Sequence, residues 1–469
     1  MVYAFALPTT SHLSFQTFLT SSTHPSLPQA ATTARHAFRQ ALKAHKRLPR
    51  GPQQDAYLQT ILTPLTNYLP YLLALSTGLS SKPIDTTTTS SEEIEITLRS
   101  EIISSWRATL TNPTTLSLKQ RPSTSSRIPG QGLDFEIAFV LTTLGYILNG
   151  LARTGVTRTL YATTTPTPEQ RTAAIQTATK HLLQASSVHS LLASPSFSSS
   201  ANTANGSTTL PDIDPTIQAA LSCLALAEAT LLAVLKDDSY IAAYIQARNP
   251  NDKDWMVKAP EIPKVRAHLF ARLCIRAAEY AEQAAAGLGS VKKVRVNEEL
   301  LAYARVLGQV ARARACRFFG VDAELAGKIG EGIAWLQAAK TVLGVKGTAA
   351  KGGFSRLKQG WMDRREDRRM EKGDMGPGDN AGREEEGRIN TQLIPPSAEL
   401  LANLPSGRDI HSPPAPYKIP SLDEDELVRM RAPPVEDESG PGSDVDDSDE
   451  ELAAYVPGAV PERSDSAYY

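Results

Sequence analysis

The sequence predicts a mostly α-helical protein, an elongated solenoid of stacked helices with a small N-terminal β-sheet. Apolar residues recur at helical spacing over most of the 469 residues, and short links join the successive helical segments, which makes them antiparallel neighbours. One stretch, 94–98, instead alternates apolar and polar residues with a period of two, as a half-buried strand does. A hydrophobic fraction of 41% is ample for a sizeable core.

The first two predicted helices cover residues 31–48 and 55–75. Apolar side chains fall on one side of each segment, which is typical of helices that pack against a core. Pro64 and Pro70 lie inside the second helix and should kink or divide it, because proline removes a backbone donor and clashes with the preceding turn.

The most apolar segment, 135–152, is predicted to be a core helix. A membrane span is disfavoured because Glu136 and Asn149 would be costly in hydrocarbon. A further helix is expected at 167–193. Asp214 followed by Pro215 marks the start of another, which should run to about residue 248. Short glycine-containing links then separate three more predicted helices, 262–287, 294–319 and 321–343.

Residues 1–434 are predicted to form one helical domain, followed by a disordered acidic tail at 435–469. Low-complexity loops are expected near 80–92, 194–210 and 344–388. Residues 389–434 are rich in proline but carry many apolar side chains, so we expect them to lie extended along the helical body.

The sequence offers no pattern for catalysis, metal binding or a cofactor, and we predict none of these. Three cysteines without a C-x-x-C pair indicate neither a disulfide framework nor a zinc site, and the eight histidines lack ligand spacing. A net charge of −1 disfavours nucleic acid. Seven arginines on the middle helices are expected mostly on solvated faces, with an acidic partner or a membrane as the alternative: Arg266, Arg272, Arg276, Arg305, Arg312, Arg314 and Arg317.

The N-terminus leaves an alternative open, because the chain has no acidic residue before Asp55 and is rich in Ser, Thr and Arg there, as organellar transit peptides are. Prolines 8, 25 and 28 would break a continuous targeting helix. A mitochondrial or other organellar helical protein, cleaved near residues 20–50, is therefore one rival reading. An enzyme with dispersed catalytic residues is the other.

Several motifs resemble the helices of BRO-type domains, the scaffolds of endosomal ESCRT adaptors. They occur in the family's order: the Trp106-Arg107 pair, the helix FEIAFVLTTLGYILNGLA from Phe135, and GEGIAWLQAA from Gly330. The C-terminal segments NTQLIP from Asn390 and LPSGRDIH from Leu404 resemble more specifically the fungal BRO-type component of the alkaline ambient-pH signalling pathway.

This resemblance implies a cytoplasmic, non-enzymatic adaptor that is recruited to endosomal or plasma-membrane signalling sites. Its implied partner is the C-terminal amphipathic helix of the core ESCRT-III filament subunit, and it would help to bring a calpain-like protease to its transcription-factor substrate. Peripheral membrane recruitment is a further implied possibility.

The resemblance also implies a groove for the partner helix. Leu269 and Leu273 fall where the family has groove-lining aliphatic residues, and their spacing of four puts them on one helix face. Ala233 takes the place of a groove aromatic, and Lys236, one turn along, would meet a carboxylate on the partner. We expect Leu273→Asp to abolish capture of the ESCRT-III helix while leaving the fold intact.

Overall fold

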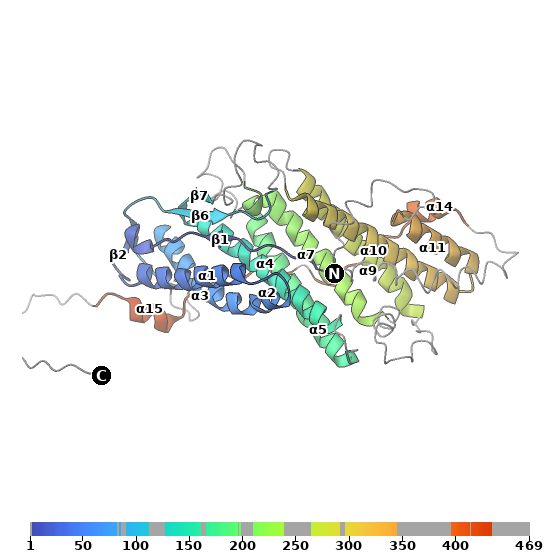
Figure 1. Cartoon of the computed structure of the whole chain (residues 1–469), viewed down its shortest axis with the longest axis horizontal. Helices are drawn as coiled ribbons and strands as arrows, with labels where there is room; N and C mark the ends of the chain where they lie inside the picture. The colour runs from blue at the N-terminus through green and yellow to red at the C-terminus, as the bar shows by residue number, and fades with distance from the viewer. Residues whose placement is uncertain are drawn as a thin grey trace, which may run out of the picture. The chain divides into compact units, whose positions relative to one another are not determined.

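The computed structural model describes residues 2–81, 84–85, 91–111, 127–160, 166–195, 197, 210–238, 264–290, 296–344, 395–412 and 414–433. The chain divides into one compact unit, Met1–Arg431, and a second, Ala432–Tyr469, and all that follows concerns the first. The prediction of a mostly helical fold with a small N-terminal sheet is confirmed (Figure 1).

The N-terminal helices are α1 (Leu27–Arg47), α2 (Pro52–Ala56) and α3 (Leu58–Leu79). Pro64 and Pro70 do not divide α3, which continues through both. The two prolines lie on its outer, partly exposed side, whereas the stripe that contains Leu65 is fully buried. Packing of that stripe against α1 and α4 therefore outweighs the hydrogen bonds that the prolines remove.

The strands form small antiparallel sheets around these helices. Trp106 on β6 (Ile103–Arg107) pairs with Thr10 on β1 (Thr9–Thr10) and with Ile128 on β7 (Ile128–Gln131). The Trp106 side chain points inward and is fully buried. The predicted strand at 94–98 is shorter than expected and pairs with β2. The sheet orders are β1 (Thr9–Thr10), β6 (Ile103–Arg107), β7 (Ile128–Gln131); β2 (Leu19–Ser21), β5 (Ile96–Leu98); and β3 (Ile84–Asp85), β4 (Ser91–Glu92).

Helix α4 (Gly132–Leu160) is the core helix that the sequence predicts. By length and composition α4 and α7 are both apolar enough to cross a membrane, but 89% of the relevant window of α4 is buried inside the protein. Its Glu136 is fully buried and accepts hydrogen bonds from Arg35 Nε at 2.8 Å, Trp106 Nε1 at 2.6 Å and Tyr68 at 3.3 Å. One carboxylate thus joins α1, α3, α4 and β6, which explains why it tolerates burial.

Beyond α4 the helices stack in series, each on the one before it: α5 (Pro168–Ala193), α7 (Pro215–Asp237), α9 (Lys264–Ser290), α10 (Glu298–Leu325) and α11 (Ile329–Val342). The predicted start of α7 is confirmed, since the Asp214 side chain accepts hydrogen bonds from the backbone N–H groups of Thr216 and Ile217. Helix α7 ends at Asp237, earlier than predicted, and residues 239–263 lie outside the described part of the chain.

The sequence predicts that the last two helices are separated at Gly320, but α10 continues through this residue to Leu325. Gly320 lies inside α10 and approaches Gly332 of α11 so closely that an added Cβ would lie 3.3 Å from the Gly332 carbonyl oxygen. The chain turns instead at Gly327, whose φ of +77° favours glycine. Here one glycine permits close helix packing and the other makes the turn.

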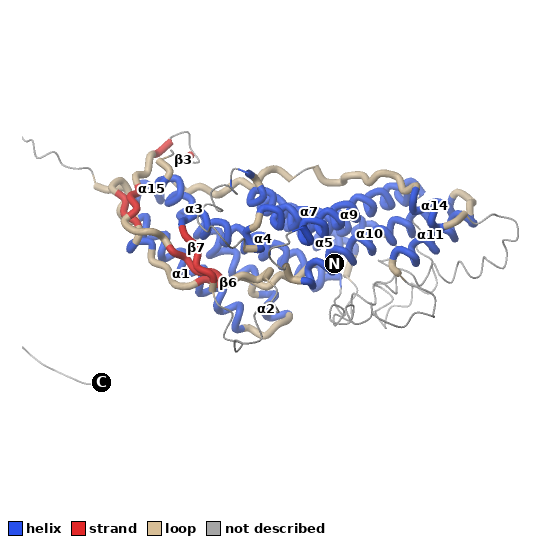
Figure 2. The backbone as a smooth tube through the Cα atoms, turned by 90° about the horizontal axis from the view of Figure 1, so that it is seen from above, coloured by secondary structure: helices blue, strands red, loops and turns tan. Residues whose placement is uncertain are grey.

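The C-terminal segment, predicted over residues 389–434, returns along the helices in its described part within the first unit, 395–412 and 414–431, and residues 389–394 lie outside the described part of the chain. Helix α14 (Ser397–Ala402) packs on α11, and α15 (Glu424–Met430) joins the N-terminal core, where Tyr71 donates a hydrogen bond to Glu426 at 3.1 Å. Figure 2 shows the connection between these two short helices running alongside the stack. Two short 3-10 helices, Phe15–Thr17 and Pro211–Ile213, complete the described elements.

Candidate functional site

Helices α7 and α9 pack antiparallel, and their register brings the four predicted site residues to one end of the pair. Continuing that register by one turn from Thr230 and Arg276 sets Ala233 opposite Leu273, with Lys236 beside Leu269. The register follows from contacts spread along both helices, which pair Ala220 with Gly287, Cys223 with Gln283, and Thr230 with Arg276.

The four residues differ in accessibility. Leu269 is half-buried and packs at the edge of the second hydrophobic cluster, and Ala233 and Lys236 are also half-buried. Leu273, in contrast, is only 2% exposed and belongs to the core. The expectation that Leu273→Asp leaves the fold intact is therefore wrong, because a carboxylate at this position would be buried without a partner.

The next part of the α7–α9 seam is covered by an extended segment, residues 404–412, which we call the strap. Two hydrogen bonds of Arg272, both at 3.1 Å, hold the strap. Arg272 Nε donates to the carbonyl of Ser406, and the backbone carbonyl of Arg272 accepts from the N–H of Arg408. An added Cβ at Gly407 would lie 2.7 Å from the backbone of Arg276, so the strap approaches α9 as closely as only glycine allows.

Asp409 fixes the middle of the strap. Its carboxylate accepts hydrogen bonds from Arg276 Nε and from the Tyr280 hydroxyl, each at 2.7 Å. Burial by itself raises the pKa of Asp409, but these two bonds outweigh it, and the pKa is lowered. The strap and the seam enclose a cavity of about 160 Å³ that also contains His411. The motif LPSGRDIH and the apolar content of the C-terminal segment marked this stretch in the sequence, but neither predicted which helices it would contact.

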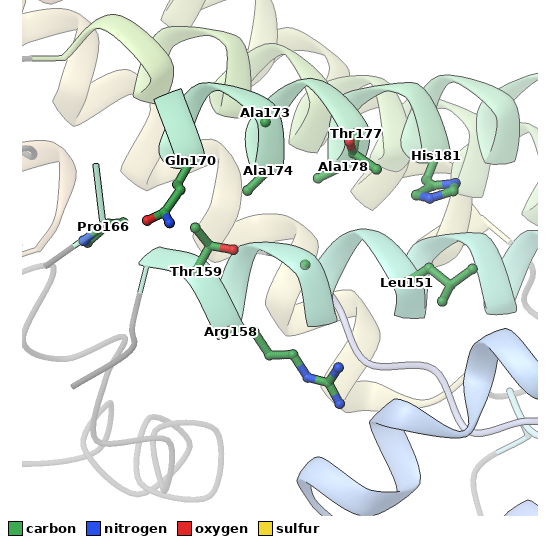
Figure 3. A pocket seen from close by; sticks show the side chains of 11 residues that line it. Leu151, Arg158, Thr159, Pro166, Gln170, Ala173, Ala174, Thr177, Ala178 and His181 are labelled. Atoms are coloured by element: carbon green, nitrogen blue, oxygen red, sulfur yellow. The ribbon is translucent and has the colours of Figure 1, made fainter. Parts of the chain in front are cut away.

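A larger cavity of about 610 Å³ lies between the end of α4 and the start of α5 (Figure 3). Small side chains such as Gly155, Ala173 and Ala174 line most of it. Arg158 and His181 are its ionisable residues, and burial, with the charge of Lys180, lowers the pKa of His181. This cavity does not join an acid, a base and a nucleophile at one point.

Several of the seven arginines on the middle helices form ion pairs with acidic side chains of the same chain. Arg276 bonds Glu279 and Asp409, Arg312 bonds Glu282 at 2.6 Å, and Arg317 pairs with the buried Asp238. Among the residues that the structure describes, no three His, Cys, Asp or Glu side chains are grouped as metal ligands.

Comparison with known proteins decides the family. The chain is 60% identical to the pH-response regulator protein palC of Emericella nidulans over the full length of both chains. The chain belongs to the palC family. No protein-family model matches it.

Solved structures agree with the palC assignment at the level of the fold. The ALIX BRO1 domain in complex with CHMP4C superposes with a TM-score of 0.54 and 15% identity, over 90% of this chain and 98% of that one. ALIX in complex with a SIVmac239 late-domain peptide gives 0.55 and 15%, over 92% and 51%. The resemblance to BRO-type domains and to the fungal pH-signalling component, stated from sequence motifs, is thereby confirmed.

Proposed function

We propose that this palC-family chain is a non-enzymatic adaptor in alkaline ambient-pH signalling. In this proposal it binds the C-terminal amphipathic helix of the core ESCRT-III filament subunit at the α7–α9 seam. The proposal rests on the antiparallel register of α7 and α9, which sets Ala233 and Lys236 level with Leu273 and Leu269, and on the half-buried side chain of Leu269 at that end of the seam. The fold relative ALIX is solved with CHMP4C, an ESCRT-III protein, bound to its BRO1 domain.

The chemistry of these residues suits an amphipathic helix. Leu269 offers an apolar edge that a partner side chain would cover, at about 1.5 to 3 kcal/mol for each well-covered aliphatic side chain. Lys236, near the C-terminal end of α7, offers a cation to a partner carboxylate. Ala233 has a small, half-buried side chain, against which a larger apolar residue of the partner would pack in this proposal.

The wider role is assembly rather than bond chemistry. Bound to endosomal or plasma-membrane sites through its partner, the adaptor would raise the local concentration of a calpain-like protease and of its transcription-factor substrate. Neither rival reading gains support. The described cavities hold no catalytic constellation. Cleavage between residues 20 and 50 would remove β1, which pairs with β6, and the fully buried Phe15.

A binding measurement with Leu269→Asp tests the proposed site. Leu269 is the better probe than Leu273 because its half-buried side chain permits substitution with less damage to the core. We expect the variant to bind a synthetic C-terminal helix of the ESCRT-III subunit at least about tenfold more weakly in calorimetry, as expected for loss of one covered leucine.

The matched control is Leu325→Asp, which makes the same change at another surface leucine, 47% exposed, at the end of α10. This control should bind like the unmodified protein. Equal affinity of the Leu269→Asp variant, with thermal unfolding unchanged, would exclude the seam as the binding site.

A further inference from the structure

Two stretches of the chain contain no acidic residue, 1–54 and 102–133, and the fold brings them together. The first includes all of α1, and the second includes all of β6 and β7. Basic residues of α1 therefore face basic residues of the sheet, with no carboxylate in either stretch to neutralise them.

These basic side chains lie close enough to lower one another's pKa values. Arg39 is the main cause of the lowered pKa of Lys43, and Arg127 adds to it. Burial is the first cause of the lowered pKa values of Arg39 and Lys46. Arg127 adds to the effect on Arg39, and Arg107 and then Arg127 add to the effect on Lys46. Like charges from α1 and from the adjoining ends of β6 and β7 thus lie close together. We call this surface the basic face: Arg39, Lys43, Lys46, Arg47, Arg107 and Arg127.

Two carboxylates of the adjoining elements are paired with other arginines. Glu136 is buried against Arg35, and Asp55 pairs with Arg153 at 3.1 Å. Glu101, which accepts from Gln131 at 3.3 Å, precedes the far end of β6 from Arg107. Among the described residues, none of the ion pairs includes a member of the basic face. The α1–sheet surface therefore carries uncompensated positive charge, although the whole chain has a net charge of −1.

An exposed apolar side chain lies at the other end of β6 from Arg107. Residues of β6 alternate between the two sides of the sheet, so Ile103 shares the outward side with Arg107 while Trp106 points into the core. Ile103 is 49% exposed. Its partner across the sheet is Gln131, which donates a hydrogen bond to Glu101, so this end of β6 lies outside the basic face.

We propose that the basic face binds directly to an anionic membrane surface. The charges are spread over a helix and a hairpin, and neither described cavity is lined by them, so they suit a layer of headgroups better than one small ligand. The nearby aromatic side chains, Trp106 and Phe38, are fully buried and unavailable for stacking on bases, which disfavours single-stranded nucleic acid.

Vesicle flotation with the full-length protein tests this surface. Wild-type protein should bind phosphatidylcholine vesicles that contain about one-third phosphatidylserine, should ignore pure phosphatidylcholine, and should dissociate as salt is raised. The double variant Lys46→Glu/Arg127→Glu changes two exposed members of the basic face. It should bind at least about 25-fold more weakly, from about fivefold for each basic group lost near the lipid.

The matched control is Arg305→Glu/Lys328→Glu, which alters the net charge equally at exposed positions in and after α10. The control should bind within about twofold of wild type. Equal loss in both double variants, absence of wild-type binding, or equal binding to pure phosphatidylcholine would overturn the proposal. So would tighter binding of an RNA oligomer than of the vesicles at matched anionic charge, lost in Lys46→Glu/Arg127→Glu, since that would identify a different partner. This inference does not rest on the α7–α9 site, and the vesicles contain no ESCRT-III protein.

Discussion

Glu228, in the middle of α7, is a fully buried carboxyl group that holds the N-terminus against the helical stack. Its Oε1 accepts hydrogen bonds from the Tyr3 N–H at 2.8 Å and from the Tyr303 hydroxyl of α10 at 2.7 Å. Burial, despite these two bonds, raises its pKa from the ordinary value of 4.5 to about 7. The hydrogen bonds of Glu228 thus join the first residues to α7 and α10. The ring of Tyr3 also packs edge-on against Phe5.

This pKa makes stability depend on pH around Glu228. The folded protein keeps a proton on the carboxyl group that the unfolded chain releases above pH 4.5, so the stabilisation is complete below pH 4.5 and is lost as pH rises through 7. Gln at this position keeps the Oε1 acceptor and cannot ionise. We expect Glu228→Gln to exceed wild type in free energy of unfolding by roughly 2 kcal/mol at pH 8, and by much less near pH 5, in urea titrations.

The exposed carboxylate Glu101 provides the control, since Glu101→Gln should follow the wild-type pH profile. A difference between Glu228→Gln and wild type that stays constant from pH 5 to 8 would show that the Glu228 carboxyl does not titrate in this range. His189, also fully buried, has its pKa lowered from 6.5 to about 4 by burial, so it destabilises the fold as pH falls through this range. Its range overlaps that of Glu228 with the opposite sign, and comparing each variant with wild type at the same pH cancels the His189 contribution.

At the scale of elements, the strap is the feature that shapes the candidate site. It is held by backbone hydrogen bonds to α9 and by the contacts of Asp409 with Arg276 and Tyr280. These contacts are partly exposed, with 49% of the Asp409 side chain accessible, so each is worth little individually. The strap is therefore a natural candidate for local opening.

Removal of the Asp409 carboxylate should loosen the strap without unfolding the helices. We expect Asp409→Ala to speed hydrogen exchange of the Gly407 and Arg408 amides about fivefold, the effect of losing about 1 kcal/mol. Exchange within α4 should stay unchanged. Arg408→Ala, which removes an exposed side chain from the same segment and keeps its backbone bond, is the control. Equal protection in Asp409→Ala and wild type would show that the backbone bonds alone hold the strap.

At the scale of the whole molecule, the two proposed surfaces belong to different parts of the helical stack. The basic face lies on α1 and the β6–β7 hairpin, whereas the seam lies between α7 and α9, and α4 and α5 stand between them (Figure 1). Surfaces that share no residue should act independently. Such an arrangement would allow one chain to contact a membrane and an ESCRT-III helix together.

This separation predicts additive behaviour. Leu269→Asp should leave vesicle binding within about twofold of wild type, and Lys46→Glu/Arg127→Glu should leave helix binding within the same range. Calorimetry and flotation with both variants measure the two effects side by side. A variant that weakens both kinds of binding, with its thermal unfolding unchanged, would show that the surfaces are coupled.

Helical periodicity predicted most of the helices, because an apolar stripe at a spacing of three to four residues has few other ways to be buried. The cap at Asp214 was equally predictable, since capping depends only on neighbouring residues. Pro64, Pro70 and Gly320 misled the prediction for one reason: each obeys its local rule only where tertiary packing does not outweigh it.

The sequence by itself determined the helical class, the core position of the segment at 135–152 and the resemblance to the BRO-type family, because these depend on local periodicity and on motif order. Only the tertiary structure decided that Leu273 is buried while Leu269 stays half-accessible, that the strap covers the neighbouring seam, and that two acid-free stretches meet in one basic face. Accessibility and charge proximity join residues that are far apart in the chain, and no local pattern encodes which distant segment will lie against them.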